Sequence, residues 1–292
     1  MPLELEKQRV DADAAAIAGL DALDTPTVVT RPWWRKAVAV GLPPLVALVL
    51  FILVWQLVWA SAITSEFKVP APIAVWDEFA ATVADNRVWS ILWTSISRAF
   101  IGFAIALVIA TPLGLLVARV AVVRAAIGPL LLGLQSLPSV AWVPAAVLWF
   151  GLTDATIYFV VLAGSIPSIA NGLVAGIDQI PPILPRVGKV LGAGGLANAR
   201  HILLPAALPG YLAGCKQGWA FSWRSLMAAE IIAAGPLLGF GLGAYLKEGS
   251  DFSNMPGVIA AIFLILIVGI GIELLVFRPI ERRVLQARGL AL

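Results

Sequence analysis

Long apolar runs with few or no charged residues dominate this chain. The runs from Val38 to Ala60 and from Ala125 to Gly151 contain no Asp, Glu, Lys or Arg. A bilayer's hydrocarbon offers no water to backbone N–H and C=O groups, so about 20 apolar residues cross it as a helix. Hydrophobic residues make up 60% of the chain and charged residues 13%, against roughly half and a quarter in soluble domains. The sequence therefore predicts a membrane protein.

Six runs have the length and apolarity of a membrane-spanning helix. They are Val38 to Ala60, Ile101 to Ala118, Ala125 to Gly151, Ala155 to Ile177, Ala207 to Ala234 and Pro256 to Phe277. The predicted fold is all-α and polytopic, with six transmembrane helices. We expect an N-terminal tail at residues 1–36, a transmembrane domain at 37–285 and a C-terminal end at 286–292.

The distribution of Lys and Arg predicts how these helices are oriented. Fourteen of these residues lie in the N-terminal tail, the second-to-third and fourth-to-fifth connections and the C-terminal end, and three lie on the other side, namely Lys68, Arg87 and Lys247. Because Lys and Arg accumulate in cytoplasmic loops, both termini are expected in the cytoplasm. The first 30 residues have neither a basic start nor an apolar core, so they predict a cytoplasmic tail rather than a signal peptide.

Two segments are expected on the outer side. Residues 71–89 carry apolar side chains at helical spacing, which predicts one helix lying along the bilayer surface. Residues 235–256 are rich in glycine. Irregular backbone is not tolerated against lipid, so this connection is expected outside the bilayer or packed inside the bundle.

The glycines around residue 192 imitate a nucleotide-binding turn. Gly192, Gly194 and Ala197 fit the pattern G-x-G-x-x-G/A, but such a turn needs a strand before it and a helix after it. Three prolines between residues 181 and 185 precede it, and prolines are excluded from central strands. No nucleotide site is predicted in this chain.

Other function classes also find little support. The single histidine, His201, and the scarcity of Asp and Glu in the runs leave no metal-site spacing, and no catalytic residue is predicted. Basic residues flank the apolar runs instead of forming one face, so nucleic acid is not an expected partner. An ion-coupled secondary transporter would need coupling carboxylates near mid-membrane, and Glu230 is the one good candidate.

A longer spacing in the fourth-to-fifth connection, at about residues 178–206, has a known counterpart. Gly192 is followed after nine residues by Ile202, then by Leu204 and Pro205. This resembles the cytoplasmic loop of ABC importer permeases, which reads E-A-A, three residues, G, nine residues, I-x-L-P. Residues 147–177 and 204–233 resemble permeases for aliphatic sulfonates, taurine, nitrate and bicarbonate, and the resemblance covers about residues 65–285.

The resemblance implies a type I ABC importer permease, a non-enzymatic subunit of an ATP-driven importer in the bacterial inner membrane. Its expected partners are a second copy of the chain, two cytoplasmic ATPases and an extracytoplasmic binding protein, with ATP and Mg²⁺ bound by the ATPases and not by this chain. The loop is expected to dock the ATPase. Gly192 suits a tight turn between two short helices, and Leu204-Pro205 suits the start of the fifth helix.

One part of the loop departs from the pattern. Arg186, Val187 and Gly188 stand where E-A-A is expected. In the family the glutamate is expected to pair with a basic residue of the ATPase, and here the sign is reversed. Either the ATPase supplies an acidic residue, or docking depends on shape and apolar contact.

Polar and aromatic side chains inside the runs are candidates for a translocation path. Arg224, with Trp219 or Trp223 nearby, is expected to attract an oxyanion such as a sulfonate, nitrate or carboxylate. The alternative is an internal ion pair, of Arg98 or Arg224 with Glu230, that only fixes helix packing. A solute of another chemistry, carried by the same class of permease, is the second functional reading.

Three more candidates lie in the third run. Gln135, Ser136 and Ser139 stand close to Pro138 and Pro144. Prolines inside a membrane helix can open backbone groups toward a cavity, which favours a polar lining. Simple helix bending, with the serines bonded to their own backbone, is the alternative.

Overall fold

The computed structural model of the protein describes residues 33–61, 65, 68–233 and 239–287. The predictions made for the N-terminal tail up to residue 32 and for the last residues, 288–292, lie outside the described residues. The chain divides into two units, residues 1–57 and 58–292, and each is described by itself.

The first unit contains most of helix α2, Trp33–Ala60. Its segment Gly41–Ala60 is long and apolar enough to cross a membrane, as predicted for the first run. Pro43 and Pro44 lie inside the helix, where each removes one backbone N–H donor. The helix is apolar along this segment, although its backbone hydrogen bonds are interrupted at the two prolines.

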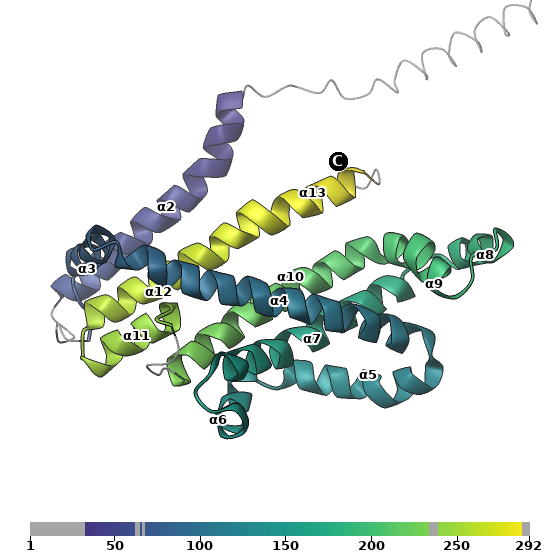
Figure 1. The fold of residues 1–292 in the computed structure, drawn as a ribbon. Coiled ribbons are helices and arrows are strands. Elements are labelled where there is room, and N and C mark those ends of the chain that lie inside the picture. Colours follow the sequence, from purple (N-terminus) through teal and green to yellow (C-terminus); the bar gives the residue numbers. More distant parts are fainter. Residues whose placement is uncertain (1–32, 62–64, 66–67, 234–238, 288–292) are drawn as a thin grey trace, which may run out of the picture. The chain divides into compact units, whose positions relative to one another are not determined.

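The second unit consists of helices throughout its described residues (Figure 1). The α-helices are α3 (Pro72–Ala84), α4 (Arg87–Arg119), α5 (Ala121–Ser136), α6 (Val143–Phe150), α7 (Asp154–Asp178), α8 (Ile183–Val190), α9 (Gly195–Asn198), α10 (Leu204–Ile232), α11 (Leu242–Asp251), α12 (Met255–Ile272) and α13 (Arg278–Gln286). A 3-10 helix η1 (Ser139–Trp142) and two π-helical segments, η2 (Ala199–Leu203) and η3 (Glu273–Phe277), join some of them.

Helix α7 packs between α4 and α10 and forms the centre of the unit. The contact with α10 is close because glycines face each other. A Cβ added to Gly214 would lie 2.6 Å from the Cα of Gly172, and one added to Gly210 would lie 2.5 Å from the Cα of Gly176. Small residues let membrane helices approach until their backbones touch, which maximises van der Waals contact. This glycine seam fixes the position of α10 against α7.

The third predicted span, residues 125–151, is broken within its length. Helix α5 and the η1–α6 pair meet at an angle of 99°. Leu137 has a ψ of 127°, because a residue before proline is driven out of the helical region. Pro138 then has no N–H with which to continue the ladder. The segment is a bent span or a re-entrant loop.

The outer helix predicted at residues 71–89 is also divided. Helix α3 ends at Ala84, and Asn86 adopts a left-handed φ of 53° before α4 begins at Arg87. A left-handed residue stops a right-handed helix, and asparagine is among the few residues that adopt this conformation readily. The glycine-rich connection contains a helix, α11, which packs against α10 and α12. The described part of this connection thus packs on neighbouring helices, whereas its position relative to the bilayer stays a prediction.

Four described helices are long and apolar enough to cross a membrane, or five if the bent pair is one span. Helix α10 has 29 residues, but Lys216, Arg224 and Glu230 lower its apolarity. The predicted fourth run matches α7 closely. The sixth is longer than predicted, since it continues through η3 to Gln286.

Candidate functional site

Helices α8 and α9 form a projection at one end of the second unit (Figure 1). This is the connection in which the sequence predicts a docking loop. Gly192 has a φ of 79° and Gly195 a φ of 49°, values that glycine adopts without steric cost. The turn between α8 and α9 is thus the tight turn expected at Gly192, and α10 begins at Leu204 with Pro205 in its first turn.

The motif positions of this loop contact each other. Gly188 lies directly against the Cδ1 atom of Ile202, so that a Cβ at residue 188 would overlap it. The loop is also held to α4, because Arg119 donates a hydrogen bond of 2.9 Å to the carbonyl oxygen of Gly195. The glycine at the last E-A-A position therefore has a packing role, which is to admit the isoleucine of I-x-L-P.

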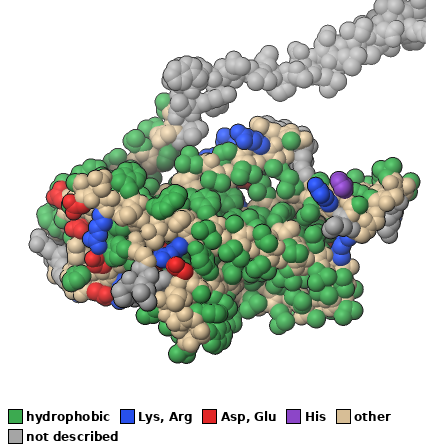
Figure 2. Space-filling model, viewed as in Figure 1, with side chains coloured by type: hydrophobic (Ala, Val, Ile, Leu, Met, Phe, Trp, Pro, Cys, Tyr) green, Lys and Arg blue, Asp and Glu red, His purple; other side chains and the backbone are tan. Residues whose placement is uncertain are grey.

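The outer surface of the loop is mainly apolar. Val187, Val190 and Leu191 are 45%, 87% and 78% exposed, and Arg186 is exposed on the same helix. Figure 2 shows Lys, Arg and His side chains near this end and Asp and Glu side chains gathered at the opposite end, over α3 and α11. An exposed apolar tip of this kind is a surface that a soluble partner can cover.

A buried charged cluster lies toward the end of α10 remote from the loop. The Glu230 carboxylate accepts hydrogen bonds from the Ser95 hydroxyl at 2.7 Å, from Arg98 Nη1 at 3.2 Å and from the Gly243 N–H at 3.0 Å. Arg98 Nη2 also donates to Asp154 at 2.7 Å. We call Ser95, Arg98, Asp154, Glu230 and Gly243 the Glu230 cluster. It joins α4, the start of α7, α10 and α11.

The packing around this cluster leaves no room for larger residues. Gly241 lies against the Glu230 carboxylate, where an added Cβ would come within 2.6 Å of it. The N–H of Leu242 donates to the Ser95 hydroxyl at 2.8 Å. Of the two ion pairs that the sequence left open for Glu230, the structure contains the pair with Arg98 and not the pair with Arg224.

Arg224 has a different environment. It lies on a face of α10 that includes Ala213, Gln217 and Ala220, and all four residues are exposed. We call these residues the α10 stripe. The Arg224 guanidinium lies 4.7 Å from the ring centre of Phe221, and its Nε donates to the carbonyl oxygen of Ala220 at 3.1 Å. No carboxylate pairs with Arg224 among the described residues.

The depth of Arg224 follows from its neighbour Ser225, whose hydroxyl lies against Gly164 of α7. Helix α7 has 25 residues, so it is about 37 Å long, and Gly164 is about 15 Å from its first residue at 1.5 Å per residue. If α7 spans a bilayer, Arg224 lies near the middle of the hydrocarbon. Large apolar side chains are exposed on other helices, as Val108 of α4 and Leu130 of α5 illustrate at 74% and 64%.

The two predicted tryptophans do not accompany Arg224. Trp219 and Trp223 are 4% and 7% exposed and stack on each other with ring centres 6.4 Å apart. Trp219 also contacts aromatic rings of α4 and η3. They pack in the core, on the same face of α10 as Glu230. The ring that the structure places against the Arg224 guanidinium is that of Phe221.

The polar residues of the third run lie at the helix break. Gln135 accepts a hydrogen bond of 2.9 Å from Asn171 of α7, Ser136 donates to its own backbone at Gly133 O, and Ser139 is half-buried near Gly164. The bond of Ser136 matches the bending alternative. Asn171, which pairs with Gln135, was not predicted from the sequence. The signal that could have identified it is a lone Asn inside an apolar run.

A second charged group, also missed from the sequence, joins α10 to the last helices. Lys216 Nζ lies 2.6 Å from Glu273 Oε1 and 3.3 Å from Glu281 Oε2. In an α-helix, residues seven apart share a face, whereas these glutamates are eight apart. The π-helical segment η3 between them inserts the extra residue and so places both carboxylates beside one lysine.

The described residues contain no group of three or more His, Cys, Asp or Glu positioned to hold a metal ion. Cys215, the one cysteine of the sequence, is a buried thiol in α10. Within the described residues the arrangement thus offers Arg224 without a carboxylate partner, two clusters in which one cation pairs with two carboxylates, and one projecting loop.

Comparison with known proteins gives these features a context. Residues 110–286 match the family described as binding-protein-dependent transport system inner membrane component. The chain is 27% identical over 248 residues to the taurine transport system permease protein of Escherichia coli, covering 83% of this chain and 88% of that protein. It is 27% identical over 252 residues to the bicarbonate transport system permease protein of Synechocystis, covering 82% and 88%.

A third relative is an archaeal protein from Methanocaldococcus jannaschii, named as a candidate ABC transporter permease. The chain is 30% identical to it over 179 residues, which are 61% of this chain and 66% of that protein.

Proposed function

We propose that this chain, which belongs to the family of binding-protein-dependent transport system inner membrane components, forms the membrane path of an ATP-driven importer for a small anionic solute. Membership makes it an ABC transporter permease and a multi-pass membrane protein. The single observation that carries the anionic solute is Arg224, which is exposed near mid-membrane without a carboxylate partner among the described residues.

A charged side chain in hydrocarbon is costly, so such residues face a bundle interior or a water-filled cavity. The α10 stripe combines Arg224 with Gln217 and two alanines, whereas the exposed large apolar side chains of α10 are confined to Ile232 at its end. This composition suits a wet surface and not a lipid contact. A guanidinium offers several donors in a plane, which fits a sulfonate, carboxylate or nitrate group.

The relatives support an oxyanion. The taurine and bicarbonate permeases are named for solutes that carry a sulfonate and a carboxylate-like group. The second candidate function is a permease of the same class that carries a different small nutrient, because selectivity in such systems rests largely on the binding protein.

The remaining architecture of the proposal follows from charge and packing. In this proposal the bent pair forms one span and helix α10 forms the sixth. Both termini lie in the cytoplasm. Two copies of the chain face each other through their α10 stripes. Two ATPases bind the projections and hold ATP and Mg²⁺. Closure of the ATPases then moves each projection as a rigid body, and the glycine seam transmits this motion from α10 to α7.

Of the two docking alternatives, an acidic residue on the ATPase or apolar contact, the exposed side chains of the loop favour apolar contact. Val190 and Leu191 are 87% and 78% exposed on the projection, and Arg186 has no ion-pair partner among the described residues. Replacing both apolar residues by Asp is therefore expected to prevent copurification of the ATPase. Replacing Arg186 alone is expected to have little effect.

The test is reconstitution of the permease with its copurified ATPase in lipid vesicles. Addition of the binding protein with its solute is expected to stimulate ATP hydrolysis and solute entry together, and Arg224→Ala is expected to reduce entry strongly. Solute entry driven by an ion gradient without ATP would show that the chain is a secondary transporter and would refute the proposal.

A further inference from the structure

A cavity of about 300 Å³ lies at the end of the second unit opposite to α8 and α9. It is formed by α3, the first residue of α4, α11 and the start of α12. The residues that give it chemical character are Glu78, Asp85, Arg87, Tyr245, Glu248 and Phe252. None of them belongs to the Glu230 cluster or to the α10 stripe, so the path proposed above leaves this cavity unused.

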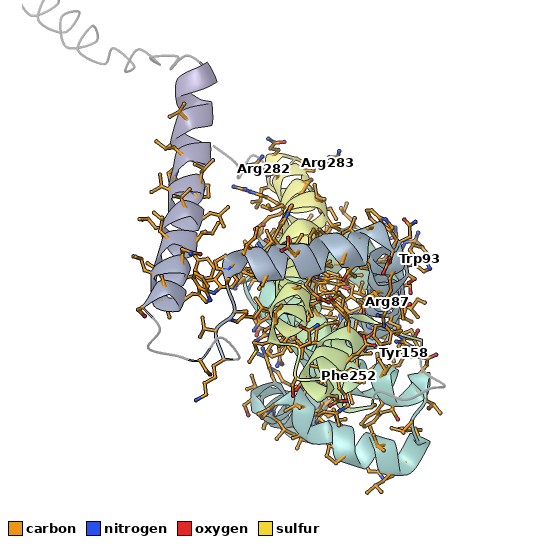
Figure 3. The ribbon with its side chains drawn as sticks, turned by 90° about the vertical axis from the view of Figure 1, so that its left-hand side faces the viewer. Arg87, Trp93, Tyr158, Phe252, Arg282 and Arg283 are labelled. Atoms are coloured by element: carbon orange, nitrogen blue, oxygen red, sulfur yellow. The ribbon has the colours of Figure 1, made fainter. Side chains whose placement is uncertain are left out.

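The floor of the cavity is polar and its rim is aromatic. Tyr245 is 4% exposed, its hydroxyl lies 3.1 Å from the Thr82 hydroxyl, and burial raises the pKa of the phenol, which therefore stays protonated. Phe252 is 78% exposed at the mouth. In Figure 3 Phe252 lies at one end of the α12–α13 rod, whereas Arg282 and Arg283 lie at the other.

The charge of the cavity is unbalanced. It contains three carboxylates and one guanidinium, and the guanidinium is already committed. Arg87 donates to both oxygens of Glu248 at 3.0 and 2.9 Å and lies 4.6 Å from the ring centre of Phe240. Glu78 and Asp85 have no ion-pair partner among the described residues. The lining thus attracts a positive group and repels an anion.

We propose that this cavity receives a Lys or Arg side chain of the extracytoplasmic binding protein. The inference rests on the proposed function, because it takes the cavity to lie on the outer side, where the binding protein approaches. The family is described as dependent on a binding protein. The ammonium or guanidinium would meet Glu78 and Asp85, and its aliphatic stem would lie along Phe252.

A bare metal ion fits the cavity less well. Among the residues that the structure describes, no three His, Cys, Asp or Glu side chains converge as metal ligands do. The aromatic rim also has no use for an ion, whereas it offers apolar contact to a long basic side chain. The negative lining attracts that basic side chain and repels the transported anion.

The experiment uses the complex of permease and ATPase in nanodiscs and titrates it with the binding protein that stimulates it. Glu78→Lys combined with Asp85→Lys is expected to raise the binding-protein concentration for half-maximal stimulation by about tenfold, because like charges then meet at the interface. The matched control is Asp77→Lys, since Asp77 is exposed on the same helix but does not line the cavity. It is expected to shift the same concentration by less than about twofold.

The pair Glu78→Gln and Asp85→Asn keeps the shape of both side chains and is expected to shift the concentration in the same direction, by a smaller factor. Basal ATP hydrolysis reports that each variant is folded and coupled. An unchanged half-maximal concentration in the double Lys variant, an equal shift with Asp77→Lys, or heat stabilisation of the isolated complex by Ca²⁺ that the double variant loses would each overturn the proposal. Absence of stimulation in the unmodified complex would instead refute the proposed importer.

Discussion

Arg98 and Arg224 lie in neighbouring helices of one bundle and have opposite surroundings. The Arg98 side chain is 8% exposed and contacts the carboxylates of Asp154 and Glu230. Arg224 is exposed, and its contacts are a backbone carbonyl and the ring of Phe221. The same guanidinium is neutralised in one place and left with its full charge in the other.

The difference separates a packing role from a binding role. Desolvating two opposite charges costs about as much as their attraction returns, so a buried pair adds little net stability, but removing one partner is expensive. An unpaired guanidinium at bilayer depth is tolerable only where water or a ligand reaches it. We therefore expect Arg98 to serve the fold and propose Arg224 as the residue that meets an anion.

The largest effect is expected from Arg98→Ala, which tests the packing side of the comparison. Glu230 would remain buried without its counter-charge, which costs about 3–5 kcal/mol. The purified permease is expected to unfold at a much lower temperature, and Arg98→Met with Glu230→Gln is expected to recover part of the loss. Arg124→Ala is the control, because its pair with Asp178 is 47% and 42% exposed and is worth less than about 1 kcal/mol. Equal melting temperatures for Arg98→Ala and the unmodified chain would contradict the packing role.

Arg224→Ala tests the binding role proposed for Arg224. Charge-assisted hydrogen bonds contribute about 1.5–3 kcal/mol each, so solute uptake is expected to fall roughly 10- to 100-fold while the melting temperature stays unchanged. Arg224→Lys keeps the charge and loses the planar fork, and it is expected to retain an intermediate rate. Normal uptake by the alanine variant would remove Arg224 from the path, and a drop in melting temperature would make it a packing residue like Arg98.

The glycine seam offers a contrast between the buried and exposed faces of α10. Gly214→Ala would force a Cβ to within 2.6 Å of Gly172 Cα, and such overpacking costs about 1–3 kcal/mol. Ala213→Val adds bulk on the stripe, where it is expected to slow uptake without lowering the melting temperature. Gly133→Ala is the control, since an added Cβ there meets nothing within 4 Å. The contrast fails if Gly214→Ala melts like Gly133→Ala.

The sequence predicted those parts of the fold that depend on one segment at a time. Apolar length predicted α2, α4, α7 and α12, because a bilayer imposes that length on each helix separately. The spacing from Gly192 to Pro205 predicted a turn and a helix start that recur in the structure. Bending near Pro138 was among the alternatives that the sequence offered, but its angle of 99° was not, because hydropathy does not report direction.

The partners of the charged residues depend on the whole fold, so the sequence could not choose between Arg98 and Arg224 as the partner of Glu230 and missed Asp154 altogether. Asp154 is 56 residues from Arg98, and nothing local marks it as a partner. In the structure Trp223 and Glu230 are buried on one face of α10, and Gln217 and Arg224 are exposed on another, because residues seven apart in a helix share a face. Which face is buried, by contrast, is decided by α7 and the glycine seam.

Arg186 completes the comparison, because it is exposed and has no ion-pair partner among the described residues, like Arg224, but projects beyond the bundle on α8. Water solvates a charge there at little cost, so exposure alone gives it no binding role. Arg186→Glu is therefore expected to change uptake and ATPase copurification by less than about twofold, within the range of a surface charge pair. A large loss would show that charge governs docking at this position, whereas a gain would indicate a basic residue on the ATPase facing it. An unchanged rate would leave membrane depth, and not exposure, as the property that distinguishes Arg224.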